Sequence, residues 1–171
     1  MEQTETEVIH YRRDVKASDR ECIRRIVEST DYFSPAEIGI ALELVEERLE
    51  KGAHSGYEFL LAEARDIVIG YTCFGAIPGT LSSFDIYWIV VRRDCQRNGI
   101  GAELLRATEF MIAEAEGRKI LVDTSSRPQY EPTRRFYERS GYRIAAMIED
   151  FYGPGDGKII YVKDIPCRIC T

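Results

Sequence analysis

The sequence has no long apolar run and no basic run. Its apolar stretches, such as residues 59–62, are far shorter than the roughly 20 residues that cross a bilayer, so we expect no membrane-spanning segment. No more than two Lys or Arg stand together, and 29 Asp and Glu outnumber 23 Lys and Arg, which gives a formal charge of −6. Because nucleic acids and anionic membranes attract basic surfaces, this charge disfavours both partners and favours a small or cationic one.

The sequence has only two histidines, and its number of cysteines, five, is odd. The two histidines, His10 and His54, lie far apart in the sequence and suggest no metal site. Five cysteines do not form the even framework of a disulfide scaffold, so a reducing cytoplasm is the expected compartment. Cys167 and Cys170 have Cys-x-x-Cys spacing, but no second pair or nearby histidine accompanies them, so a metal or redox role is not expected. Residues 1–7 carry three acids and no apolar segment, which argues against a secretion signal.

What the sequence does have is enough apolar material for a globular core. Its 171 residues, 44% of them apolar, correspond to one domain of ordinary size. We expect an acidic leader over residues 1–7, a domain over residues 8–165 and a short tail over residues 166–171.

Within the expected domain, helix-like and strand-like segments alternate. Apolar residues at helical spacing predict four helices. One of them is expected to begin at Ser34-Pro35, a cap residue followed by a proline, and to end at Gly52. Segments rich in β-branched and aromatic residues predict strands. The predicted order is a strand at residues 8–13, helices beginning near residues 17 and 35, strands at 57–64, 67–77 and 84–91, a helix at 99–116, a strand at 119–123, a helix at 131–140, and strands at 142–148 and 158–163. This order predicts an α/β domain around a mixed sheet.

The most informative segment is the turn at residues 96–101, Gln-Arg-Asn-Gly-Ile-Gly, between a predicted strand and a long predicted helix. Backbone N–H groups in such a turn, together with the positive end of the helix dipole, bind phosphate or diphosphate. The residues after the second glycine are not the lysine and hydroxyl residue of a P-loop, and no third glycine follows at the Rossmann spacing. An ordinary glycine-containing turn before a helix stays open as the alternative. Positive charge near the turn comes from Arg92, Arg93 and Arg97.

Residues 96–101 resemble the Gln/Arg-x-x-Gly-x-Gly/Ala signature of the GNAT superfamily of acyl-CoA-dependent N-acetyltransferases. Residues 130–142 resemble the family's Asn-x-x-Ala-x-x-Phe/Leu-Tyr-x-x-x-Gly-Phe/Tyr segment, with Tyr130 and Thr133 in place of the asparagine and alanine. The likeness in element order covers roughly residues 8–165. It implies a single GNAT-like domain, a mostly antiparallel mixed sheet of about seven strands flanked by four helices, with acetyl-CoA as co-substrate and no metal.

The resemblance further implies that a substrate amine attacks the thioester of acetyl-CoA directly. Tyr137 matches the family's general acid, which gives a proton to the departing thiolate. Asp85 is the first candidate for the base, since an acid within an apolar strand is costly unless it is used, although a strand-end acid facing solvent would have the same pattern. Asp123 ranks second, and Glu149 or Asp150 third.

The resemblance also implies which residues hold the two substrates. The family binds pantetheine along the fourth strand and the diphosphate in the glycine turn, with further contacts from the second segment. The expected cofactor contacts are therefore Ile89, Val90, Val91, Gln96, Arg97, Asn98, Gly99, Ile100, Gly101, Ala102, Tyr130 and Thr133. The expected substrate contacts are Tyr32, Phe33, Asp123 and Tyr152.

The sequence thus predicts an N-acetyltransferase acting on the primary amine of a small molecule or an amino acid. Acetylation of a peptide or protein N-terminus and a non-catalytic acyl-CoA-binding module remain as alternatives. Nucleic acid and membrane partners are not expected, and a homodimer stays open. The acceptor amine, the acyl chain length and the oligomeric state are not determined by these patterns.

Overall fold

The computed structural model describes residues 8–166, so the predicted leader, Cys167 and Cys170 lie outside the described residues. The chain forms two compact units. The first comprises the chain up to Cys73 together with Trp88–Leu104, and the second comprises Phe74–Tyr87 and the chain from Leu105 onward. None of the helices within residues 8–166 is long and apolar enough to cross a membrane.

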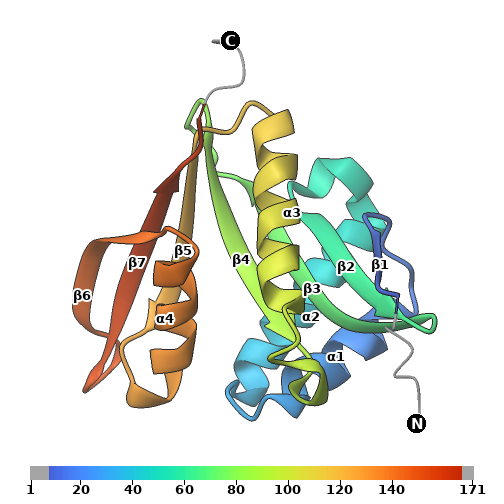
Figure 1. Ribbon diagram of the computed structural model, residues 1–171, viewed down its shortest axis with the longest axis horizontal. Coiled ribbons are helices and arrows are strands. Elements are labelled where there is room, and N and C mark those ends of the chain that lie inside the picture. The colour runs from blue at the N-terminus through green and yellow to red at the C-terminus, as the bar shows by residue number, and fades with distance from the viewer. Residues whose placement is uncertain (1–7, 167–171) are drawn as a thin grey trace, which may run out of the picture. The chain divides into compact units, whose positions relative to one another are not determined.

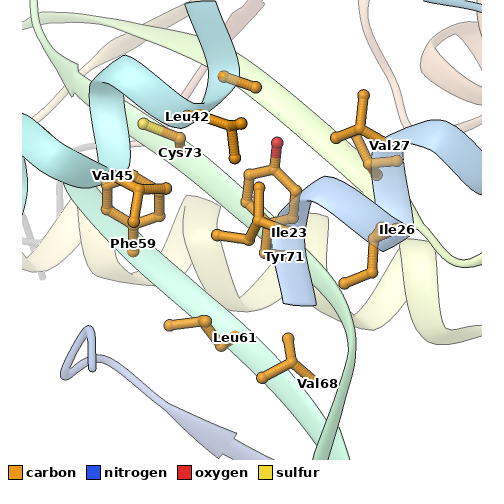
Figure 2. Close-up of a cluster of buried hydrophobic side chains, with 12 residues drawn as sticks. Ile23, Ile26, Val27, Leu42, Val45, Phe59, Leu61, Val68, Tyr71 and Cys73 are labelled. Atoms are coloured by element: carbon orange, nitrogen blue, oxygen red, sulfur yellow. The ribbon is translucent and has the colours of Figure 1, made fainter. Parts of the chain in front are cut away.

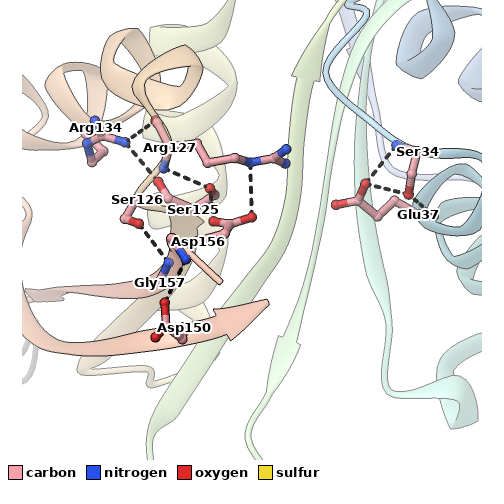
Figure 3. Close-up of polar contacts among 10 residues, drawn as sticks. Ser34, Glu37, Ser125, Ser126, Arg127, Arg134, Asp150, Asp156 and Gly157 are labelled. Atoms are coloured by element: carbon pink, nitrogen blue, oxygen red, sulfur yellow. Dashed lines mark hydrogen bonds and ion pairs between the residues drawn. The ribbon is translucent and has the colours of Figure 1, made fainter. Parts of the chain in front are cut away.

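The first unit contains two helices and the amino-terminal strands. Its elements are β1 (His10–Arg12), α1 (Asp19–Ser29), α2 (Pro35–Lys51), the short 3-10 helix η1 (Gly52–Ser55), β2 (Glu58–Ala64), the first part of β3 (Ile67–Ala76), the end of β4 (Ser83–Val91), the 3-10 helix η2 (Arg93–Cys95) and the start of α3 (Ile100–Glu114). The α2 start is a capping box, since the Glu37 N–H donates to Ser34 Oγ at 3.3 Å and the Ser34 N–H donates to Glu37 Oε2 at 2.7 Å (Figure 3). Arg65 and Asp66, both with positive φ, form the predicted tight hairpin between β2 and β3.

The core of the first unit lies between the helix pair α1–α2 and strands β2, β3 and β4. Apolar side chains from both helices interdigitate with those of the strands, as Figure 2 shows. The buried cluster consists of Ile23, Ile26, Val27, Ala41, Leu42, Val45, Phe59, Leu61, Val68, Tyr71, Cys73 and Val90. At its edge, the Arg12 guanidinium bonds the buried Asp19 at 2.5 and 2.8 Å and Glu63 at 2.6 Å, which fastens β1 to the start of α1.

The second unit contains most of α3 and the carboxyl-terminal strands. Its other elements are β5 (Lys119–Ser125), the 3-10 helix η3 (Pro128–Tyr130), α4 (Glu131–Arg139), β6 (Arg143–Gly153) and β7 (Asp156–Asp164). β5 pairs in parallel with β4 over only the first four residues of each strand, and antiparallel with β7 along its whole length. β6 pairs antiparallel with β7, and α4 lies beside β5 and β7 (Figure 1).

A two-way contact fastens the β6–β7 turn to the loop after β5 (Figure 3). Ser126 Oγ accepts from the Gly157 N–H at 2.7 Å, and the Ser126 N–H donates to the Gly157 carbonyl at 2.8 Å. The Asp156 carboxylate accepts from Ser125 Oγ and pairs with Arg127 Nε at 3.0 Å. The two segments, 31 positions apart in the sequence, are therefore one connected piece of structure.

Within residues 8–166, seven strands in the order β1-β2-β3-β4-β5-β7-β6 form one sheet, accompanied by four α-helices. This confirms the predicted fold class and the predicted order of elements. The main difference is β6, which extends to Gly153 instead of ending at residue 148, because its pairing with β7 resumes at Gly153 after a register shift that begins at Ile148. Such irregular pairing leaves no periodic signal in the sequence.

Candidate active site

The turn before α3 is held open by its backbone conformation. Arg97 has φ 66° and Gly99 has φ 82°, the left-handed region that glycine adopts most readily, and no atom lies within 4 Å of the position that a Gly99 Cβ would take. The Gln96 side-chain amide donates to the Val91 carbonyl at 2.9 Å, which closes the turn onto the end of β4. The N–H groups of the first helical residues, Ile100, Gly101 and Ala102, precede the first intrahelical bonds and lack partners of that kind.

Two of the three arginines near this turn are neutralised by acids. Arg92 Nε pairs with Asp94 at 2.6 Å, and Arg93 pairs with Asp31 in the connection between α1 and α2. Arg97 makes no ion pair within the described part of the chain. The capacity of the turn to bind an anion thus rests on backbone N–H groups and on Arg97, not on the three arginines that the sequence suggests.

The end of β4 continues past its pairing with β5. The register of that pair ends at Ile86 and Val122, so Ile89, Val90 and Val91 extend beyond it. Val90 and Val91 are buried, whereas Ile89 is half-buried.

Asp85, Asp123 and Lys158 lie on one face of the sheet. Asp85 is opposite Leu121, and Asp123 is two residues after Leu121, so the two carboxylates share that face. On the other side of β5, Asp123 is opposite Ile160 of β7. Lys158 is two residues before Ile160 and therefore lies on the same face. Lys158 Nζ forms an ion pair with Asp123 and lies 4.9 Å from the centre of the Phe151 ring.

Burial raises the pKa of the half-buried Asp85 carboxyl, the negative charge of Asp123 raises it further, and Lys158 opposes both effects. A carboxyl with a raised pKa is a better proton acceptor at neutral pH. The structure does not leave Asp85 facing solvent freely, which was the alternative that its sequence pattern left open.

Tyr137 is buried in α4 among aromatic rings. Its ring centre lies 5.7 Å from those of both Tyr142 and Tyr161. Burial, with a contribution from the charge of Asp123, raises the pKa of Tyr137, so the phenol keeps its proton at neutral pH. The same carboxylate therefore acts on both Tyr137 and Asp85.

Tyr130 lies directly before α4, the helix that carries Thr133 and Tyr137. It lies in η3, before α4 begins, and serves as the N-terminal boundary of that helix. Its buried ring lies 5.7 Å from the Arg127 guanidinium carbon. Pro128 starts this separate 3-10 turn and Pro132 opens the α-helix after it, which explains the interruption.

The remaining predicted residues are scattered. Phe33 packs on Trp88, with ring centres 4.9 Å apart, and so contributes to the core of the first unit beside Tyr32. Tyr152 is exposed on β6. Asp150 accepts from the Gly155 N–H at 2.7 Å and is used in the turn between β6 and β7, while Glu149 is exposed.

Lys158 is a residue of the candidate site that the sequence did not predict. Its alternation with Ile160 on a predicted strand places the two on one face, but only the register of β7 against β5 puts Lys158 beside Asp123. No cluster of three or more potential metal ligands occurs in the described ranges.

The comparisons with known proteins agree with this fold. The acetyltransferase (GNAT) domain model matches residues 55–144, more than half of the chain and a span that includes the glycine turn, Asp85, Asp123 and Tyr137. A protein of Desulfovibrio desulfuricans assigned to the GNAT acetyltransferases is 41% identical, covers 93% of this chain and 100% of its own, and superposes with a TM-score of 0.91. The chain belongs to the GNAT acetyltransferase family.

Two further proteins resemble the chain less closely. An uncharacterised N-acetyltransferase of Methanocaldococcus jannaschii is 31% identical over 113 residues, which are 63% of this chain and 67% of that protein. An aminoglycoside 6'-N-acetyltransferase complexed with coenzyme A shares the fold at 18% identity, with a TM-score of 0.72 over 93% of this chain and 98% of its own.

Proposed function

We propose that this chain transfers the acetyl group of acetyl-CoA to the primary amine of a small molecule or an amino acid within a ternary complex. The observation that carries the proposal is the GNAT acetyltransferase fold, in which Asp85 and Asp123 lie on one face of the sheet and Tyr137 lies in α4. The pKa of Asp85 is raised, the pKa of Tyr137 is raised, and Asp123 acts on both. Attack by an amine needs a group that takes a proton from nitrogen, and departure of a thiolate needs a group that gives one.

Acetyl-CoA fits the turn before α3. Arg97 and Gly99 have left-handed conformations, and the space beside Gly99 allows an anion to approach the backbone of the turn. We assign its diphosphate to residues 96–102 and its pantetheine arm to the main chain of Ile89, Val90 and Val91. Tyr130 and Thr133 stay proposed as further cofactor contacts. Acetyl-CoA supplies the activated thioester carbonyl.

Asp85 and Tyr137 would divide the proton transfers. Asp85 takes a proton from the amine as the N–C bond forms, through one water where the short aspartate side chain does not reach. Tyr137 gives its phenolic proton to sulfur as the C–S bond breaks, and solvent returns that proton afterwards. From a neutral amine the products are the amide and free CoA, because the proton that Asp85 releases to solvent equals the one that Tyr137 regains. An ammonium acceptor first loses one further proton to solvent.

The charge of the site favours a cationic acceptor. Two carboxylates and one ammonium, Asp85, Asp123 and Lys158, leave a net charge of −1 when both acids are ionised. Tyr152 adds exposed aromatic surface on β6. An alkylammonium group is held by charge pairing and by aromatic faces, which supports a small amine or amino acid as acceptor.

Acetylation of a peptide N-terminus is the second candidate. The exposed Tyr152 on β6 favours it, because a peptide backbone can lie against an aromatic side chain on an accessible strand. A non-catalytic acyl-CoA-binding module is the third, and it requires that the proton acceptor and donor described above have no role.

Thiol release distinguishes the three candidates. The protein is incubated with acetyl-CoA and either a panel of small amines and amino acids or a panel of peptides, with a reagent that reports free thiol, and CoA binding is measured in parallel by calorimetry. Release with the small amines alone supports the proposal, and release with peptides alone favours the second candidate. CoA binding without thiol release on either panel would identify a binding module.

We also propose that the chain pairs with a second copy through β6. This strand ends the sheet order, and its large apolar residues Ile144, Met147 and Ile148 are exposed. Antiparallel pairing centred on Ala146 places Arg143 of one copy opposite Glu149 of the other and Ile144 opposite Ile148. Opposite charges and apolar side chains thus meet across the same symmetric strand pair.

A further inference from the structure

Two carboxylates of the site face the same side of the sheet, and each has the chemistry of a base. What distinguishes them is Lys158, which forms an ion pair with Asp123 and not with Asp85. The following inference rests on the proposed function and concerns which of the two carboxylates takes the proton.

The position of Lys158 is fixed from three sides. Its backbone pairs with Ser125, the last residue of β5, and with Ile148 on β6, the last pair before the register shift between β6 and β7. Its ammonium group lies against the Asp123 carboxylate and 4.9 Å from the centre of the Phe151 ring. The side chain is only 21% exposed, whereas the paired Asp123 is 40% exposed, so the cation is the better shielded member of the pair.

We infer that Lys158 is a positioning residue that selects the base: it holds Asp123 in a lasting ion pair and thereby leaves Asp85 to accept the proton of the substrate amine. Lys158 also occupies the place between Asp123 and the Phe151 ring that would otherwise attract the ammonium group of the acceptor.

The charges that act on Asp85 come from two neighbouring strands. Asp123 on β5 favours its protonated form, and Lys158 on β7 favours its ionised form, while Tyr137 on α4 is neutral at the working pH. If Lys158 loses its charge, two like charges face each other without compensation, and one of the carboxyls takes up a proton at higher pH.

The test is the pH dependence of kcat/KM in Lys158→Met, which keeps the apolar stem and removes the ammonium group. The acid limb, where Asp85 must lose a proton, is expected to move to higher pH by about one unit. Lys158→Arg keeps the charge and is expected to keep the limb in place. Lys119→Met is the matched control, since it removes an exposed ion pair with Asp164 from the neighbouring strand β5 and is expected to leave the limb unmoved.

A second arm asks whether Asp123 becomes a base when Lys158 is gone. With Lys158 present, we expect Asp85→Asn to lower kcat/KM by about 100-fold and Asp123→Asn by less than about 10-fold. In the Lys158→Met background, Asp85→Asn is expected to cost clearly less, because Asp123 is then free to accept the proton. An acid limb that stays in place in Lys158→Met, or an unchanged cost of Asp85→Asn, would overturn the inference.

Failure of the proposed function gives a different result. If the wild-type protein releases no thiol with any acceptor, the acetyl transfer itself is wrong, and the selection of a base falls with it. If the wild type turns over and the variants leave the acid limb unmoved, only the role of Lys158 is wrong.

Discussion

The Tyr137 side chain combines a packing role with a polar one. Its ring contacts those of Phe136, Tyr142 and Tyr161 at centre distances of 5.5 to 5.7 Å. Tyr137→Phe keeps these ring contacts and removes only the phenolic proton donor. We expect kcat to fall by about 100-fold at saturating acceptor, with a thermal midpoint within about 2 °C of the wild type.

Tyr142→Phe is the control for this prediction, because it removes a hydroxyl group from the same aromatic cluster and leaves the Tyr137 hydroxyl, the proposed acid, in place. Its kcat should equal that of the wild type. Equal kcat values for all three proteins would remove Tyr137 from the mechanism.

Asp85 is expected to weaken the fold while it serves the reaction. Since burial raises its pKa, the folded protein binds this proton more tightly than the unfolded chain, and stability falls as pH rises from the ordinary carboxyl pKa through the raised one. Asp85→Asn should therefore raise the melting temperature at pH 7 by about 1–3 °C while kcat/KM falls. The two melting temperatures should converge below about pH 4, where both states hold the proton.

Melting curves at several pH values check this prediction. If Asp85→Asn melts at a lower temperature than the wild type at pH 7, or if its melting temperature differs by the same amount at every pH, burial does not destabilise the ionised Asp85 carboxylate.

At this scale the sequence predicted some residues and not others. Asp85 ranks first among the candidate bases because an acid inside an apolar strand is unusual. This argument uses the strand's own sequence and no contact with other strands, and the role of Asp85 as the base stays a prediction. Lys158 was not found, because its significance depends on the register of β7 against β5, which one sequence does not contain. The sequence overestimates the charge of Arg93 for a related reason, since its partner Asp31 is 62 positions away. Asp94, the partner of Arg92, is only two residues away.

At the scale of elements, the turn before α3 depends on one glycine conformation. Gly99 has φ 82° and open space around it, so Gly99→Ala introduces backbone strain of about 1 kcal/mol without a steric clash. The added methyl group projects toward the surface that the diphosphate would approach. We expect CoA affinity, measured by calorimetry, to fall by at least about 10-fold.

Gly79→Ala provides a matched control in the turn between β3 and β4. Gly79 has φ 79° and no atom within 4 Å of a Cβ, so the substitution carries the same strain at a position remote from the turn sequence. Both variants should lose similar stability, and only Gly99→Ala should lose CoA affinity. Equal affinities would exclude this turn as the diphosphate site.

The elements themselves were largely predictable because their signals are local. The Ser34–Glu37 capping box, the Gly52 stop and the Arg65-Asp66 hairpin each lie within a few residues of the boundary that they define. The separate η3 turn and the carboxyl end of β6 were not predicted. The end of β6 depends on its pairing with β7, a contact between segments, whereas η3 is a short 3-10 turn set apart from α4 by Pro128 and Pro132.

At the scale of the whole molecule, the exposed edge of β6 predicts a dimer. Light scattering after size exclusion should give twice the 19.6 kDa mass of one chain. Met147→Lys places a charge near the centre of the proposed strand pair and should give a monomer. Ile67→Lys, at a residue of similar exposure on β3, should leave the mass unchanged.

A monomeric wild type would contradict this prediction directly. A dimer that Met147→Lys does not disrupt would place the interface elsewhere. The fold class was predictable at this scale from the order of the elements. Which strand lies at the edge of the sheet was not, because it follows only from the pairing of all the strands.

The reciprocal contact between Ser126 and Gly157 has a practical consequence for protein engineering. Because Tyr152 on β6 is a proposed acceptor contact, grafting the β6–β7 hairpin of a relative onto this scaffold would be one way to test acceptor preference. Here the transplanted hairpin would lose its attachment unless Ser125, Ser126 and Arg127 were transplanted with it. The two segments form one exchangeable module, and libraries that diversify them separately would mostly sample poorly anchored hairpins.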